Sequence, residues 1–466
     1  MNRLHAVWGL AFALVIAFSV GAEPAADWGG SLTTSSSVQS VPDGSDDDAF
    51  VNSERLVLYL TAPLGSSWEL VAQGTARFDT SPLFAADVEK FYFQNTIDFA
   101  DQTAEREVQQ PGGLLQFVSR TGRFSLSEPT GLVLRQAVDG VDVTVSGQRS
   151  RIDLGAGYAG LVNKEFSALS MSLQDSADAE DGDVYFGPPR LLGRGTLALP
   201  GLVARQNLTL AFAFQQDLRD PDSVVQDGTD SADVATPGGL IDTQYAIARV
   251  DGPIPGVGTL FYSLTYVFNS GRVMGLLDDP AANSGSSYQY SPIRAHLVRG
   301  DVQYFLPEFF SAAASAAVTY SSGDDDYQAF TEGNTDGNAT MFTAATPSSQ
   351  GAVFGLQSGN STVAEVSWSM KPFSGSSGLT ESLLARAVLY SFFRSAGSGP
   401  VSVSDVDAAT SGAYLGSEVD LDFRWRPFSD LGVGLTSGFL FANSDVMLDS
   451  ANSVDYVLRL NASLSF

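Results

Sequence analysis

The chain has 466 residues, with 53 Asp and Glu against 25 Lys and Arg, and a formal net charge of −28 at pH 7. Such acidity argues against nucleic acid as a partner, because phosphate contacts need lysine and arginine. Hydrophobic residues make up 44% of the chain, too many for a disordered protein, and cysteine is absent, so no disulfide can stabilise the fold.

The first 22 residues predict a secretory signal peptide. Arg3 supplies the basic start, an apolar run extends from Val7 to Val20, and Gly21-Ala22 suits cleavage after Ala22. The run is short for a membrane-spanning helix, which disfavours an uncleaved anchor. Because no run of about 18 apolar residues follows, a helical membrane protein is excluded. We expect residues 23–466 to form a single domain.

Segments of alternating polar and apolar residues follow one another along the rest of the chain. This two-residue period is typical of β-strands, which turn successive side chains to opposite faces. Pro or Gly marks the short turns between these segments, and nine long loops alternate with eight such turns. Eighteen strands are predicted, at residues 27–38, 55–62, 67–78, 91–101, 114–126, 141–146, 149–158, 192–199, 206–218, 242–250, 258–268, 294–305, 311–320, 362–371, 382–393, 414–426, 431–442 and 454–466.

The pattern predicts an all-β fold, a transmembrane antiparallel β-barrel of about 18 strands, with 16 as the alternative. A soluble β-sandwich competes, but its strands average about five or six residues, and these are longer. Eighteen closed strands enclose more space than their own side chains fill, so an aqueous lumen is expected. We expect the cell outer membrane of a Gram-negative-type envelope, with outer-membrane lipid and the barrel-assembly machinery as partners.

The last segment, residues 454–466, has one apolar face and one largely polar face and ends on Phe466. It resembles the assembly signal of bacterial outer-membrane barrels, although an ordinary amphipathic edge strand would show the same alternation. The residues that would form this signal are Tyr456, Leu458, Leu460, Leu464 and Phe466.

No enzyme signature is present. His5 lies in the signal segment, and His296 is the only other histidine. A catalytic triad would therefore depend on His296, and there is no Gly-x-Ser-x-Gly motif. The usual zinc ligand sets are excluded as well. We expect no enzyme activity, no cofactor and no metal.

Arginines are placed within strands, on the polar face. A charge on the lipid face costs roughly 2–4 kcal/mol at the membrane midplane, so these side chains should face the lumen. In residues 415–426 the outward set begins with Leu415, and the inward set holds three carboxylates and two guanidiniums. Arg120 and Arg123 are three residues apart and take opposite phases unless a bulge intervenes. The candidate pore-lining residues are Arg55, Arg77, Arg120, Arg123, Arg151, Arg386, Glu418, Asp420, Asp422, Arg424, Arg426 and Arg459.

These charges have two interpretations. They form a polar constriction that selects solutes, or an Arg–carboxylate lattice that stiffens the wall, and both can hold together. The long loops contain acidic runs at 46–48, 175–183, 217–233 and 324–326. None matches a complete calcium-binding loop, so a solvated outer surface is the favoured interpretation.

The last hairpin, residues 415–426 and 431–441, resembles the end of the alginate-export family of outer-membrane barrels. Arg120-Thr-Gly-Arg123, followed by Asp139-Gly-Val-Asp142, resembles a second motif of that family, with Phe124 where the family has Gln. The resemblance implies an 18-stranded barrel that passes a polyanionic polysaccharide. The carboxylates Glu418, Asp420 and Asp422 would repel an anionic substrate. From the resemblance we therefore expect only the barrel architecture and the pore role, and not the family's substrate.

The sequence thus predicts a porin-like channel for diffusion or export of hydrophilic solutes, saccharides included, through an Arg/Asp/Glu-lined lumen. The alternative is a plugged, surface-exposed barrel whose long acidic loops bind a partner or cations. Whether the longest loop, residues 321–359, folds into the lumen is not readable from the pattern.

Overall fold

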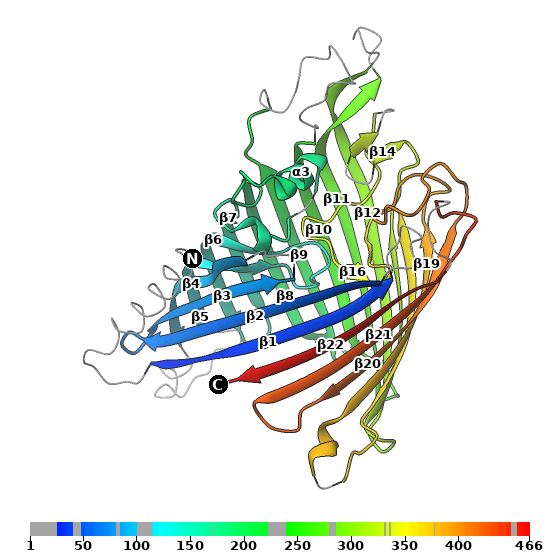
Figure 1. Ribbon diagram of the computed structural model, residues 1–466. Coiled ribbons are helices and arrows are strands. Elements are labelled where there is room, and N and C mark those ends of the chain that lie inside the picture. Colours follow the sequence, from blue (N-terminus) through cyan, green and yellow to red (C-terminus); the bar gives the residue numbers. More distant parts are fainter. Residues whose placement is uncertain are drawn as a thin grey trace.

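The computed structural model describes residues 26–40, 48–80, 84–99, 114–169, 171–221, 239–278, 286–329, 332–334, 337–376, 378–448 and 454–466. The predicted signal peptide therefore lies outside the described residues. Eighteen antiparallel strands form one closed sheet (Figure 1). Closure is direct, because the first and last strands pair from Ser31↔Ser465 to Gln39↔Val457. The prediction of an 18-stranded barrel is confirmed, and the alternative of 16 strands is wrong.

The strands of the barrel, in chain order, are β1 (Asp27–Ser40), β2 (Asp48–Pro63), β3 (Trp68–Asp79), β4 (Phe84–Asp98), β5 (Leu114–Ser127), β6 (Arg135–Gly147), β7 (Arg151–Tyr158), β8 (Arg190–Val203), β9 (Gln206–Asp217), β10 (Ile241–Pro253), β11 (Leu260–Asp278), β12 (Ser286–Leu306), β13 (Ala312–Ser321), β18 (Ser361–Met370), β19 (Leu384–Arg394), β20 (Tyr414–Trp425), β21 (Leu431–Ala442) and β22 (Val454–Ser465). Each pairs with its neighbours in the chain, so the ring is an up-and-down meander.

Several strands extend further toward the long-loop end than the alternation indicates. β2 begins at Asp48 rather than residue 55, and β4 begins at Phe84 rather than residue 91. In β4 the register with β3 shifts beside Gln73, which leaves Glu89 as an extra residue. Such a bulge interrupts the two-residue period while the strand continues, so the pattern in the sequence ends too early.

Most outward side chains in the membrane-spanning part are apolar, as a lipid-facing wall requires. On β22, Leu458, Leu460 and Leu464 are exposed, whereas Val457 on the opposite phase is buried. Among the described residues, no helix has both the length and the apolar composition needed to cross a membrane.

The long connections contain short elements of their own. They are η1 (Lys164–Phe166), α3 (Leu173–Glu180), β14 (Tyr327–Ala329), β15 (Glu332–Asn334), β16 (Ser349–Gln350) and β17 (Leu356–Gln357), while η2 (Leu379–Ser382) lies in a connection at the other end. Figure 1 shows α3 and β14 at the same end of the barrel. We call residues 322–360, between β13 and β18, the inward loop.

The expected water-filled lumen is partly occupied by an apolar cluster. Met341, Phe342 and Ala345 of the inward loop are buried against lumen-facing side chains such as Leu134 and Tyr245. Further members come from β5, β8, β11 and β12, so the cluster reaches across the ring. The inward loop therefore gives the barrel an internal core at its long-loop end.

A second apolar cluster corrects one assignment. Leu415, expected to face lipid, is fully buried beside Phe392 and Leu440 inside the barrel mouth. The register of β19 and β20 shifts here, so that Phe392 pairs with Gly416 and Phe393 with Tyr414. Because this bulge interrupts the alternation, Leu415 turns inward.

Candidate functional site

The inward loop is attached to the wall formed by β6 and β10. The amide of Thr346 donates to the carbonyl of Val133 at 2.9 Å, and the Thr346 hydroxyl accepts from the amide of Arg135 at 2.6 Å. From β10, the Tyr245 hydroxyl donates to the carbonyl of Thr343 at 2.7 Å. Nearer the start of the loop, burial beside Asp324 raises the pKa of the Tyr327 phenol. This side of the loop is thus held by backbone hydrogen bonds around a buried apolar cluster.

The same loop is attached to β20, which lies on another arc of the ring. Glu418 is fully buried and accepts hydrogen bonds from the amides of Val353 at 2.8 Å and Phe354 at 2.9 Å. Asp420 accepts from the amide of Ala352 at 3.1 Å. We call these contacts the latch. Carboxylates that accept backbone N–H groups form charge-assisted bonds, which are about twice as strong as neutral ones.

Two glycines make this approach possible. Gly351 has φ +87°, and a Cβ there would lie 2.6 Å from Glu418 Oε2. Gly438 on β21 faces the loop, and a Cβ on it would lie 2.8 Å from both Asp420 Oδ1 and Val353 Cγ2. The loop and wall therefore approach too closely at these points for any side chain.

Below the latch, toward the short-turn end, charged and hydroxyl side chains follow one another around the wall. Arg299 donates to Thr319 at 2.9 Å and lies 3.8 Å from Glu365, which also pairs with Arg386 at 3.1 Å. Asp422 lies opposite Arg386 and accepts from the Thr436 hydroxyl at 2.7 Å. We call this set the lumen belt: Arg299, Thr319, Glu365, Arg386, Asp422, Thr436 and Arg459.

Some arginines of this wall have no acidic partner. In the described part of the chain, Arg424, Arg426 and Arg459 form no ion pair with a carboxylate. Arg424 lies opposite Gly434 on β21 and is exposed, so its guanidinium has free space beside it. Arg426 follows β20 at the short-turn end and is exposed as well. These guanidiniums are available to a solute.

The facing arc, β2 to β6, holds a second set of paired arginines. Arg55 lies directly opposite Arg77, and their charges are offset by Glu89 and by Asp79 at 2.8 Å, respectively. Arg120 donates a hydrogen bond to Gln94 at 2.9 Å and lies 3.8 Å from Asp142. Two of these guanidiniums remain well exposed, Arg55 at 50% and Arg120 at 39%.

Arg123 takes the phase opposite to Arg120, as the spacing requires. Arg120 shares its phase with buried Phe124. Arg123 forms ion pairs with Asp139 on β6 at 2.8 Å and with Asp87 on β4 at 3.0 Å. Its side chain is only 13% exposed. Arg151 pairs with Asp153 at 2.9 Å near a short turn. Both arginines are held by carboxylates of the wall.

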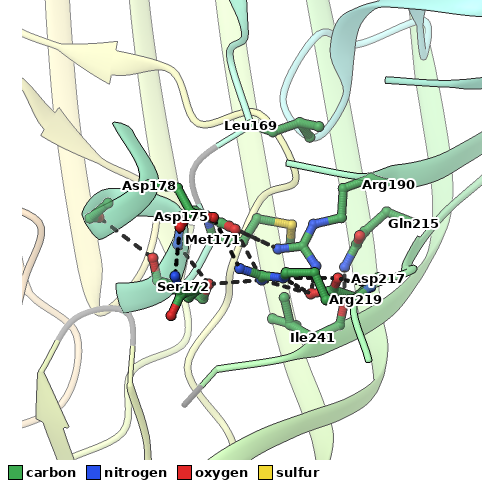
Figure 2. A network of polar contacts seen from close by, with 12 residues as sticks. Leu169, Met171, Ser172, Asp175, Asp178, Arg190, Gln215, Asp217, Arg219 and Ile241 are labelled. Carbon is green, nitrogen blue, oxygen red and sulfur yellow. Dashed lines mark hydrogen bonds and ion pairs between the residues drawn. The ribbon is translucent and has the colours of Figure 1, made fainter. Parts of the chain in front are cut away.

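Acidic residues of the long loops do not all form a solvated surface. Figure 2 shows Arg190, the first residue of β8, facing Asp175 of α3 and Asp217 of β9. Arg190 is fully buried and pairs with Asp175 at 2.8 Å, and Arg219 pairs with Asp217 at 2.7 Å. Two guanidiniums thus neutralise two buried carboxylates and fasten α3 to the rim. The interpretation of residues 175–183 and 217–233 as purely solvated is wrong at Asp175 and Asp217.

The residues of the expected assembly signal lie along β22 and after it. Leu458, Leu460 and Leu464 face outward, and the Tyr456 hydroxyl donates to Asp48 at 2.5 Å. Phe466 exchanges backbone hydrogen bonds with Gly30, at 2.9 and 3.0 Å. The role of these residues in assembly stays a prediction.

Several residues of the charged walls are not among those predicted from the sequence. Arg299 and Glu365 belong to the lumen belt, and Arg194 pairs with Asp142 at 2.8 Å. All three lie inside predicted strands, so the alternation within each strand could have placed these side chains on the lumen face. Arg190 carried no such signal, because its partners Asp175 and Asp217 are brought to it by the path of the loops.

No family model and no curated relative matches the sequence. Solved structures do match, among them outer-membrane porins of the Occ/Opd group. Acinetobacter baumannii OccAB2 is similar at 12% identity and a TM-score of 0.53, covering 94% of this chain and 98% of that one. Pseudomonas aeruginosa OccK2 (OpdF) in complex with glucuronate is similar at 12% identity and a TM-score of 0.52, with the same coverage. Pseudomonas aeruginosa OccK10 (OpdN) also gives 12% and 0.52, covering 94% and 99%.

At these identities the likeness shows the fold. That fold is the Gram-negative outer-membrane β-barrel, in agreement with the outer-membrane location expected from the sequence. None of the three structures belongs by its name to the alginate-export family, so that resemblance rests on the short motifs alone.

Proposed function

We propose that this protein is an outer-membrane channel of the porin type, through which small hydrophilic solutes diffuse past the inward loop. The observation that supports this most is the loop itself, which is joined to β6 and β10 on one side and to β20 on another. A barrel of 16–18 strands leaves an aqueous channel. A loop fixed across it at several points narrows the opening to a defined size, which is the condition for selecting small solutes.

Two arginines of the lumen wall support a preference among solutes. Arg459 of the lumen belt and Arg424 beside it present guanidiniums without acidic partners, next to carboxylates that are engaged by Thr436 and by the loop. A planar guanidinium binds a carboxylate through two parallel hydrogen bonds. We propose that the preferred solutes are small and carry a carboxylate, acidic saccharides included. The glucuronate bound by OccK2 has this chemistry.

Electrophysiology tests the proposal. The refolded mature chain in a planar bilayer should give a steady conductance, and adding glucuronate should reduce the ionic current in a concentration-dependent way. Glucose, which has the same ring but no carboxylate, is the matched control. Equal block by both sugars would remove the carboxylate preference while leaving the channel itself in place.

The second candidate function is a plugged barrel whose long loops bind a partner or cations. It is favoured by one observation, the buried apolar cluster that the inward loop forms inside the barrel. The two functions differ in conductance, because a plugged barrel passes no steady current. Export of a polysaccharide, implied by the alginate-export resemblance, would require a lumen wide enough for a chain. Block by a long uronate oligomer applied from the short-turn side tests that role.

A further inference from the structure

The outer wall near the long-loop end of β11 and β12 carries basic residues on a face that is mostly apolar. Arg272 shares the outward phase of Leu264 and Tyr266, which are both exposed. On the neighbouring strand, Arg294 and His296 share the outward phase, since Ser270 pairs with Arg294 and Phe268 with His296. Three basic residue positions therefore gather on one outward face of a chain whose net charge is −28.

Their height along the wall matches the lipid headgroups of the outer leaflet. β11 starts at the short-turn end with Leu260, and Arg272 lies roughly 30 Å further along the membrane normal for a strand tilted by about 40°. The outward apolar band of such barrels is about 25 Å tall. Tyr266 and His296, whose side chains are joined at 2.8 Å, lie within this band, with Tyr266 roughly 16 Å above Leu260 by the same measure. Arg272 and Arg294, which lie further along, are at its upper edge or just above it.

The two arginines differ in what already binds them. Arg272 pairs with Asp242 at 2.8 Å and stacks on Tyr290 with 4.4 Å to the ring centre, yet its side chain is 56% exposed. Arg294 is exposed, and its side chain forms no ion pair with a carboxylate in the described part of the chain. Asp242 thus offsets the charge of Arg272 alone, and the guanidinium of Arg294 leaves an excess positive charge at the headgroup level.

A groove of about 570 Å³ adjoins Arg272 on the outer wall of β9 to β11. Its membrane side is formed by Phe212 and Phe214, with Gln244 level with Phe214, and its upper side by Gln216 and the ion pair of Asp242 with Arg272. An apolar floor below a polar upper edge, with the exposed guanidinium of Arg272 at that edge, suits a lipid, with an acyl chain below and a charged headgroup above. A soluble anion would need the upper edge alone.

We propose that this outer face binds one acylated, phosphorylated glycolipid of the outer leaflet. Its phosphate lies between Arg272 and Arg294, where guanidiniums bind phosphate oxygens through paired hydrogen bonds. One of its acyl chains fills the groove over Phe212 and Phe214. The inference is independent of the channel function, because every residue involved faces away from the lumen.

Native mass spectrometry of the full mature chain tests it, with bisphosphorylated lipid A as the probe. We expect one lipid A to remain bound, and the double variant Arg272→Gln/Arg294→Gln to bind it about 30-fold more weakly, at roughly fivefold per cation near an anionic lipid surface. The matched control is Arg149→Gln/Arg205→Gln, which removes two exposed arginines from the short turns at the opposite end and should leave binding unchanged.

Two further probes separate the sources of affinity. Lipid A stripped of both phosphates should bind as weakly to the wild type as intact lipid A binds to the double variant. Inorganic phosphate should compete only at far higher concentration, because it lacks the acyl chain. Equal binding of the phosphate-free lipid, or equal binding by the double variant and the wild type, would overturn the proposal. Full displacement by equimolar inorganic phosphate would overturn it too, by assigning the arginines to a soluble anion.

Discussion

The buried carboxylate of Glu418 on β20 accepts a hydrogen bond from the backbone amide of Phe354 at 2.9 Å, and this joins the barrel wall to a loop that begins after β13. In the ring, β18 and β19 lie between β13, where the inward loop begins, and β20, which holds Glu418. The contact of Glu418 with Phe354 therefore fixes how far the inward loop extends across the lumen, and with it the size of the opening.

Removing the latch should make the channel wider and noisier. In Glu418→Gln/Asp420→Asn both charges are lost and with them about 1.5–3 kcal/mol for each charge-assisted hydrogen bond. We expect larger single-channel conductance with frequent transitions between levels. Asp422→Asn is the matched control, since Asp422 is on the same strand and binds Thr436 instead of the loop. Identical, quiet traces for the double variant would mean that the apolar cluster alone holds the loop.

Gly351→Ala should weaken the same contact by a different route. The added Cβ would lie 2.6 Å from Glu418 Oε2, at a φ of +87° that alanine rarely adopts. Gly355→Ala is the control, because its φ is +61° but nothing lies within 4 Å of the added carbon. Both variants place an alanine at a positive φ, which lowers the free energy of unfolding by about 1 kcal/mol. Only Gly351→Ala also disturbs the contact with Glu418, so only this variant should add current noise. The result to look for is a difference between the two recordings.

Ion selectivity should follow the unpaired guanidiniums of the lumen. Reversing them in Arg424→Glu/Arg459→Glu replaces two positive charges by two negative ones beside the lumen belt. The reversal potential under a potassium chloride gradient should shift toward the potassium potential. Arg294→Glu, on the outer wall, is the control and should leave the reversal potential unchanged. No shift in the double variant would show that ions do not pass this part of the wall.

The buried arginine network should fasten α3 to the rim. Arg190→Leu leaves Asp175 and Asp217 with Arg219 as their only guanidinium, and breaking such a buried pair costs about 3–5 kcal/mol. We expect residues 171–189 to become sensitive to limited proteolysis in the folded, detergent-solubilised protein. Arg151→Leu removes a pair that is 57% exposed on the arginine side and should have little effect. Equal resistance of both variants would argue against the anchoring role.

The alternation of polar and apolar residues was sufficient to predict the number of strands and which face of most strands is apolar. On β20, Glu418 and Asp420 contact the inward loop and Asp422 binds Thr436 of the next strand, so the three carboxylates share one face of the strand. Alternation failed at the bulges beside Glu89 and at Leu415, where one extra residue reverses the phase while hydrogen bonding continues. A period can be read only where the ladder is regular.

The path of the loops could not be predicted in this way. Nothing in residues 337–346 distinguishes an external loop from one that packs Phe342 inside a barrel, because burial there depends on residues from β5 to β12 that are distant in the chain. The same holds for Asp175, which belongs to an acidic run but is neutralised by Arg190. Charge composition indicates a solvated segment only when no partner is brought to it by the fold.

Single-channel recording of the refolded mature chain, beside a variant with residues 338–357 replaced by a short Gly-Ser linker, tests whether the protein is a channel that the inward loop narrows. We predict a steady conductance for the wild type and a severalfold larger one for the variant, since the loop that narrows the lumen is gone. Absence of conductance from wild-type protein that is folded, as judged by heat-modifiable mobility, would contradict the channel and favour the plugged barrel. Equal conductance of the two proteins would contradict the assignment of the inward loop as the constriction.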